Sequence, residues 1–192
     1  MSPEPNSERR SERARLAILD AVFDLCVSKG YAKVTIEAIA SQAGVGKPTI
    51  YRWWRSKGAL ALDVLNERIG SNTDFPDTGD IVADLTTQMT RVTALLTSDT
   101  GRVYRGVIGE AQNDPELMRA MRETVVNPRI HGCRRRLEIA VKAGQLRADV
   151  PTSSMVDLFY GPVYYRFLLG FDVPDIRACT DLVEEVVAGL RP

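Results

Sequence analysis

The sequence predicts an all-α protein of about nine helices, divided into an N-terminal and a longer C-terminal region. Apolar residues recur every three or four positions along almost the whole chain, and no stretch alternates as a half-buried strand does. Glycines, prolines and N-cap residues separate the periodic segments. The 192 residues are 44% hydrophobic, which is enough to bury a sizeable core.

One apolar stripe marks the first helix, and Gly30 after it allows a left-handed turn. The stripe consists of Leu16, Leu19, Phe23 and Cys26. The residues before it are polar and charged, so we expect a disordered N-terminal arm over residues 1–12. This polar start lacks the apolar segment of a secretory signal, so the expected compartment is the cytoplasm.

Two short helices and a tight turn follow. Thr35 has the chemistry of an N-cap for a helix over residues 36–43, which Gly44 ends. Pro48 suits the first turn of the next helix, which reaches Trp53. A short amphipathic helix, a glycine turn and a second short helix form the helix-turn-helix pattern.

The polar stretch from Gly70 to Gly79 predicts a domain boundary after a fourth helix that Ser56 caps. We therefore expect a helix-turn-helix domain over residues 13–70 and a second helical domain over residues 71–192. The further helices expected in the second domain lie near residues 80–98, 102–112, 115–126, 128–143, 153–170 and 174–190.

The net charge is zero, but the charge is distributed unevenly. Between residues 31 and 60 a single acid, Glu37, accompanies a group of basic residues. These are Lys33, Lys47, Arg52, Arg55 and Lys57. A local basic patch on a neutral chain predicts one face that meets phosphate.

The outer face of the second short helix carries hydrogen-bond donors, a methyl group and aromatic rings, a mixture that suits the major groove of DNA. Its members are Gly46, Lys47, Thr49, Tyr51, Arg52 and Trp53. Lys57 lies in the first turn of the following helix. Its positive side chain adds to the positive end of that helix, so we expect it to anchor a phosphate.

The segment from about Leu16 to Leu65 resembles the DNA-binding domain of the TetR/AcrR family of regulators. The matching text is ILDAVFDLCVSKGY, followed by VTIEAIASQAGVGKPTIYRWWRSKGAL. The resemblance implies a sequence-specific, DNA-binding transcriptional regulator. It also implies a phosphate contact by Thr35, and a core position for Trp54. The implied base contacts are Lys47, Pro48, Thr49 and Tyr51, and the implied backbone contacts are Tyr51, Trp53 and Lys57.

A single short reading helix contacts few bases, so we expect a homodimer on a palindromic operator of double-stranded DNA. The last two helices carry more apolar surface than one side of a small domain needs. The expected dimer residues are Leu158, Val163, Phe167, Ile176, Cys179, Val183, Val186 and Leu190. The alternative for this set is the core of an intramolecular bundle.

In the resembled family the helices between the domains enclose a pocket for a small effector. Methionine and aromatic side chains would line an adaptable cavity for a small apolar or aromatic molecule. The candidates are Met89, Tyr104, Met118, Met121, His131, Phe159, Tyr160 and Tyr164. Plain core packing remains the alternative for each of them.

Other functional classes find less support. One histidine, three unspaced cysteines and no glycine-rich phosphate loop leave no catalytic or metal-binding constellation. We therefore expect neither an enzyme nor a cofactor, and no membrane span. A repressor that an effector releases is the favoured function, with an effector-independent or activating regulator as the alternative. A more remote alternative is a helical protein-interaction module that does not bind DNA. A redox role for one of the cysteines also stays open.

Overall fold

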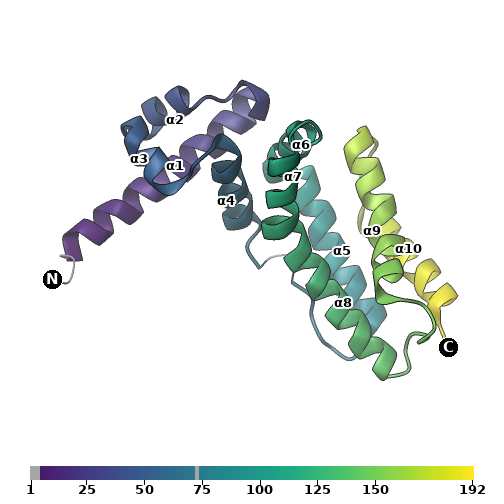
Figure 1. Ribbon diagram of the computed structural model, residues 1–192. Helices are drawn as coiled ribbons and strands as arrows, with labels where there is room; N and C mark the ends of the chain where they lie inside the picture. Colours follow the sequence, from purple (N-terminus) through teal and green to yellow (C-terminus); the bar gives the residue numbers. More distant parts are fainter. Residues whose placement is uncertain (1–4, 72–73) are drawn as a thin grey trace. The chain divides into compact units, whose positions relative to one another are not determined.

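The computed structural model describes residues 5–71 and 74–192, and over these residues it contains helices and no strand (Figure 1). The helices are α1 (Pro5–Lys29), α2 (Ile36–Ala43), α3 (Lys47–Trp53), α4 (Lys57–Ile69), α5 (Ile81–Thr97), α6 (Asp99–Ala111), α7 (Pro115–Met121), α8 (Asn127–Lys142), α9 (Thr152–Leu169) and α10 (Ile176–Leu190). A 3₁₀ turn, η1 (Tyr31–Lys33), precedes α2, and a π-helical segment, η2 (Arg122–Val126), joins α7 to α8 without a break. With that continuous segment counted once, the described residues form nine α-helices, which confirms the predicted fold class.

The chain divides into two compact units, and the division differs from the expected domains. The first unit comprises Met1–Arg68 and Arg102–Thr124, and the second comprises Ile69–Gly101 and Val125–Pro192. Most of α6, from Arg102 onward, and all of α7 therefore belong to the first unit, although the sequence pattern places them in the C-terminal domain. Two glycines permit this close packing. A Cβ at Gly58 would lie 2.8 Å from Cδ1 of Leu117, and one at Gly106 would lie 3.1 Å from Cβ of Tyr31.

Helix α1 begins earlier than expected. Residues 5–12 belong to its first turns rather than to a disordered arm, and residues 1–4 lie outside the described part of the chain. Arg15 supports this helix, because its guanidinium bonds Glu12 one turn earlier at 3.0 Å. It also lies within 3.9 Å of Asp63 and 3.8 Å of Glu67 on α4.

The buried face of α1 is rotated from the predicted stripe. It consists of Ile18, Leu19, Ala21, Val22, Leu25 and Cys26. Leu16, which the sequence pattern had placed in the core, is exposed. Both stripes fit a helical period, and the neighbouring helices select the one with more aliphatic bulk.

Local signals account for the helix-turn-helix. Thr35 Oγ1 accepts a hydrogen bond from the Ala38 amide at 3.2 Å and caps α2. Gly44 ends α2 in the left-handed region at φ +65°, where a side chain would be strained. The Val45 amide then bonds the Ala40 carbonyl at 3.0 Å and closes the turn.

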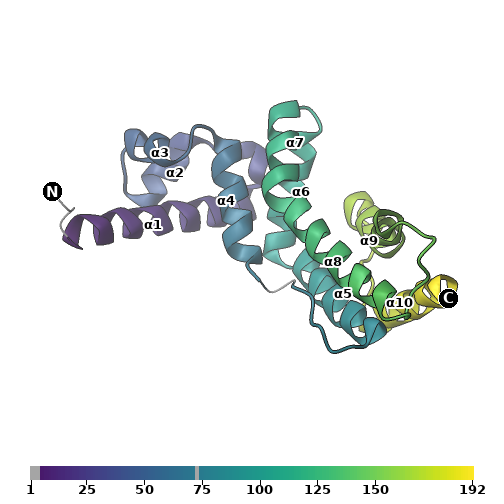
Figure 2. The same ribbon diagram turned by 60° about the horizontal axis from the view of Figure 1, so that its bottom comes forward.

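The second unit is built from α5, α8, α9 and α10, which lie side by side in both views (Figures 1 and 2). Helix α10 packs against α5, and α9 packs against α8. Helix α9 continues through Pro162 to Leu169. Within the described part of the chain, no helix combines the length and apolar character needed to cross a membrane.

Candidate nucleic-acid interface

Helix α3 is held by one buried residue and leaves its opposite side open. Gly46 precedes it in an extended conformation, and Pro48 occupies its first turn. Ile50 is fully buried and anchors the helix in the core of the first unit. The amide of Trp54 bonds the Ile50 carbonyl at 3.0 Å and ends the helix.

The predicted outer face of α3 is largely exposed. Its exposed members are Lys47, Pro48, Tyr51, Arg52 and Trp53, and Thr49 is half-buried. The side chains of Tyr51 and Trp53 remain 52% and 42% exposed. Large aromatic rings at this level of exposure are typical of a contact surface rather than of a core.

The two adjacent tryptophans have different environments. The Trp54 ring is buried, and its Nε1 donates a hydrogen bond to Asp63 Oδ2 on α4 at 2.9 Å. The Trp53 ring lies 6.1 Å from the Trp54 ring, and the Arg52 guanidinium lies 6.0 Å from the Trp53 centroid. Trp54 is therefore a core residue, as expected. Its buried ring lies next to the exposed Trp53 ring, which in turn lies next to Arg52.

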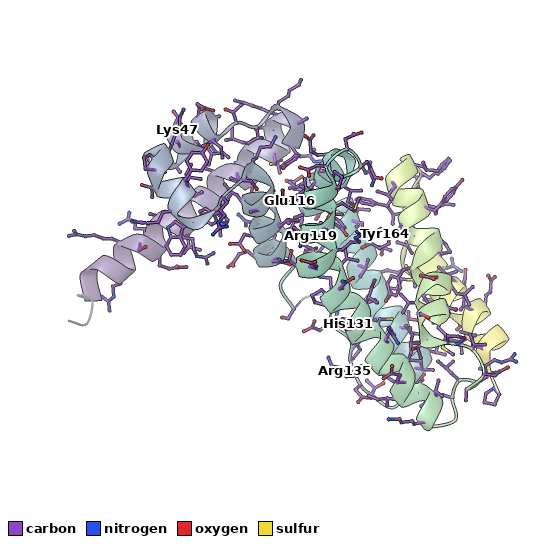
Figure 3. All side chains as sticks on the ribbon, in the orientation of Figure 1. Lys47, Glu116, Arg119, His131, Arg135 and Tyr164 are labelled. Atoms are coloured by element: carbon purple, nitrogen blue, oxygen red, sulfur yellow. The ribbon has the colours of Figure 1, made fainter. Side chains whose placement is uncertain are left out.

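Lys47 has a partner that the sequence pattern did not indicate. Its Nζ lies 2.6 Å from Oε1 of Glu37, in the first turn of α2 (Lys47 is labelled in Figure 3). The two side chains are 50% and 64% exposed. The hydrogen bond from Lys47 lowers the pKa of Glu37, and the same bond raises the pKa of Lys47, so both groups are held in their charged forms.

Lys57, which is predicted to anchor a phosphate, is half-buried and has a partner within the protein. Its ammonium lies 4.3 Å from the centre of the Tyr31 ring and donates a hydrogen bond to the Tyr31 carbonyl at 3.3 Å. The turn η1 places Tyr31 beneath the start of α4, where its ring is buried. Burial raises the pKa of Tyr31 to about 12. Lys57 therefore joins η1 to α4 within the first unit.

The eight candidate pocket residues are divided between the two compact units. Tyr104, Met118 and Met121 belong to the first unit, and the other five belong to the second. His131 is exposed on α8, on the same outer side as Arg135 (Figure 3), so the second unit by itself does not enclose it. Met89 and Phe159 are fully buried in the second unit.

A hydrogen bond between two polar side chains lies inside the second unit. The Tyr160 hydroxyl donates a hydrogen bond to the side-chain oxygen of Gln88, a buried residue of α5. Burial raises the pKa of Tyr160 well above its usual value, with a further contribution from Cys133. Tyr164, half-buried on the same helix, meets Phe167 edge to face at 6.3 Å.

Most of the predicted dimer residues are core residues of the protomer. The residues of this predicted set with almost no exposed surface are Val163, Phe167, Cys179, Val183 and Leu190. Val186 is half-buried. Helix α10 packs against α5 and α9 packs against α8, so the five buried side chains belong to the core of the second unit. Leu158 and Ile176 remain 48% and 65% exposed.

Helix α9 and the segment after it carry an exposed apolar face that the sequence pattern did not separate from the core. It comprises Leu158, Tyr165, Leu168, Leu169 and Phe171. The rings of Tyr165 and Phe171 stack at 5.9 Å. We call this set the α9 face.

The three cysteines are buried free thiols. Burial raises the pKa of Cys26 to about 11 and that of Cys133 to about 12, and it also raises the pKa of Cys179. A reactive or sensing cysteine needs an accessible thiolate, so these environments are those of structural thiols.

Two family descriptions match the chain. The description "Bacterial regulatory proteins, tetR family" matches residues 18–64. The description "Tetracyclin repressor-like, C-terminal domain" matches residues 75–186. The two matches together cover the helix-turn-helix and the helices that follow it.

Individual relatives agree with this assignment along nearly their full lengths. The HTH-type transcriptional regulator YdeS of Bacillus subtilis is 35% identical over 182 residues, 95% of this chain and 92% of the relative. The DNA-binding transcriptional repressor TetR of Mycobacteroides abscessus is 26% identical, over 86% of this chain and 88% of its own. The crystal structure of the TetR family transcription regulator SCO0332 superimposes with a TM-score of 0.77 at 38% identity, covering 93% of this chain and 99% of its own. The chain therefore belongs to the TetR family and is a DNA-binding transcriptional regulator, not an enzyme.

Proposed function

We propose that the exposed face of α3 enters the major groove of a palindromic operator and that the protein represses transcription there until a small effector releases it. The observation that carries this proposal is the exposure of Tyr51 and Trp53 beside Lys47 and Arg52, on a helix whose opposite side is anchored by Ile50. Such a surface offers exposed donors and aromatic rings on one side of a short helix, with Lys47 also paired to the exposed Glu37. The repressor named among the relatives supports the direction of control.

The proposed roles follow from position on the helices. Lys47, Pro48, Thr49 and Tyr51 face bases from the first turns of α3, where a reading helix contacts base edges. Arg52 and Trp53, at the other end of α3, contact the sugar-phosphate backbone. Thr35 contacts phosphate at the start of α2, where free backbone amides favour an anion. Lys57, at the start of α4, also contacts phosphate, and its bond to the Tyr31 carbonyl positions it there. Its loss should therefore weaken binding to all sequences alike.

We further propose that two copies associate through the α9 face. Contiguous exposed aromatic and aliphatic side chains are typical of surfaces that become buried on association. A second copy is the fitting occupant, because a two-fold axis doubles the base contacts of one short helix. Of the predicted dimer set, Leu158 belongs to the α9 face, and Ile176 is exposed at the start of α10.

The proposed effector is a small apolar or aromatic molecule bound in the second unit. Met89 and Phe159 supply apolar surface there, and the Tyr160–Gln88 hydrogen bond supplies polar atoms that could fix its orientation. An effector lowers operator affinity only by its differential affinity for two conformations of the protein. Because the proposed partner is chromosomal DNA of a bacterium, the proposed compartment is the cytoplasm.

Selection of bound sequences from random duplex DNA tests the proposed function. We expect one enriched palindrome with half-sites about 34–36 Å apart, or a multiple of that distance. Enrichment of no sequence, with binding equally weak to all duplexes, would contradict the proposal. The enriched duplex placed over a promoter then separates repression from activation in transcription with purified polymerase.

The dimer is tested by sedimentation of Leu169→Glu beside Ile139→Glu. Leu169 is 61% exposed and Ile139 is 41% exposed, but only Leu169 lies in the α9 face. We expect the first variant to be a monomer and the second to remain a dimer. The same state for both would show that the α9 face is not the interface.

A further inference from the structure

We propose that Glu37 and Lys47 read one G·C base pair together, with Lys47 on the guanine and Glu37 on the cytosine. Glu37 thereby becomes a specificity-determining residue on α2, outside the reading helix. This inference rests on the proposed function, because it requires the N-terminal end of α3 to lie in the major groove.

The geometry brings a donor and an acceptor together at one accessible point. Lys47 Nζ and Glu37 Oε1 are 2.6 Å apart, and each side chain is at least half exposed. Lys47 is the first residue of α3 and Glu37 the second residue of α2, so the pair bridges the N-terminal ends of both helices.

The major-groove edge of a G·C pair has the complementary pattern. Guanine presents its O6 and N7 acceptors, and the cytosine N4 amino group lies directly beside O6. Lysine donates to guanine O6 and N7, and glutamate accepts from cytosine N4. Bonded donor and acceptor atoms in a base pair are about 3 Å apart, which is close to the spacing of the two side-chain atoms.

Without a partner in the complex, the Glu37 carboxylate would weaken the binding of DNA. A lone carboxylate beside DNA is repelled by the phosphates, and Glu37 is the single acid between residues 31 and 60. Its pairing with Lys47 reduces that repulsion. The cytosine amino group then supplies the second hydrogen-bond donor that an exposed carboxylate loses when water leaves the groove.

The test measures the affinity of the full-length protein for its selected operator and for duplexes with each base pair of one half-site replaced. We expect Glu37→Ala to lose the preference for G·C at a single position, by about tenfold, and to keep the other preferences. Lys47→Ala should lose preference at the same position. In the double variant the two losses should not add, because both residues read one pair.

Glu37→Gln gives a second, conservative readout, because an amide prefers adenine over cytosine. We expect its preference at that position to move toward adenine. Glu116→Gln, which removes one exposed charge from α7 of the same unit, serves as the matched control and should leave every preference unchanged. Thermal unfolding of each variant shows that the fold is retained.

Three outcomes overturn the inference. Glu37→Ala could strengthen binding to all duplexes by one common factor, which would make Glu37 only an electrostatic neighbour of Lys47. The position lost in Glu37→Ala could be an A·T pair, or it could differ from the position lost in Lys47→Ala. Failure of the unaltered protein to bind any duplex would instead refute the proposed function itself.

Discussion

The side chains of Asp84 and Arg136 form a buried ion pair that joins α5 to α8 inside the second unit. Arg136 Nε donates to Asp84 Oδ2 at 2.7 Å, and Nη2 lies 2.6 Å from the same oxygen. Asp84 is fully buried, and the Arg136 side chain is 3% exposed. Thr78 donates to Asp84 as well, from its hydroxyl at 2.7 Å and from its amide at 3.2 Å.

Replacement of Arg136 by methionine should therefore destabilise the second unit severely. Asp84 would remain buried without its charge partner, a change that costs about 3–5 kcal/mol. Urea unfolding followed by circular dichroism measures the loss. Arg147→Met is the control, because the Arg147–Asp149 pair is exposed and its removal should leave the unfolding free energy unchanged. Equal unfolding midpoints for the two variants would contradict the role given to the buried pair.

Gly101 should tolerate no side chain. A Cβ at this position would lie 2.0 Å from the carbonyl oxygen of Leu96, so the backbone between α5 and α6 would have to move. We expect Gly101→Ala to lower the unfolding free energy by about 1–3 kcal/mol. Gly109→Ala, in the same helix with nothing within 4 Å, should instead stabilise the protein by about 0.5–1 kcal/mol. Thermal unfolding distinguishes the two, and a gain for both would refute the tight approach.

Lys57→Met should lower stability and weaken binding to every duplex by the same factor. The variant loses both the contact with the Tyr31 ring and the bond to the Tyr31 carbonyl. A partly desolvated cation on an aromatic face contributes about 0.5–2 kcal/mol. Arg55→Met, at an exposed cation two residues earlier, should leave the unfolding midpoint unchanged. If Lys57→Met were as stable as Arg55→Met, the contacts of Lys57 with Tyr31 would not stabilise the fold.

The three thiols should react slowly while the protein is folded. Burial raises the pKa of Cys26 to about 11 and that of Cys133 to about 12, so both stay protonated at neutral pH. These neutral thiols stabilise the fold below the usual pKa of 9.0, and that contribution is lost as the pH rises through 11–12. Reaction with a chromogenic disulfide should therefore follow global unfolding. Fast reaction of one thiol in the folded protein would restore a redox role for that cysteine.

Locally signalled features could be predicted from the sequence. Helix α2 has the predicted bounds because Thr35 caps it and Gly44 ends it, both within a few residues. The prediction of which face of α3 is exposed was also correct, since Ile50 faces inward and the residues around it face outward. Capping and turn chemistry depend on neighbours in the chain, so a sequence contains the information they need.

Features that depend on distant partners could not be predicted. The apolar stripe with Phe167 and Val183 suits a dimer seam and a core equally, and only the helices packed over it decide. The Glu37–Lys47 pair spans ten positions across a turn, so it depends on how α2 and α3 cross. Lys57 looked free because the sequence does not show that η1 brings Tyr31 beneath it.

Site-specific photocrosslinking tests the central claim that α3 lies against DNA. The crosslinking residue p-benzoylphenylalanine replaces Tyr51 on α3 in one protein and Tyr165 on α9 in another, two tyrosines that are similarly exposed at 52% and 59%. Each protein is irradiated on the selected operator in low salt, where the complex forms. We predict a protein–DNA adduct from position 51 and a protein–protein adduct from position 165. A DNA adduct from position 165 with none from position 51 would contradict the account.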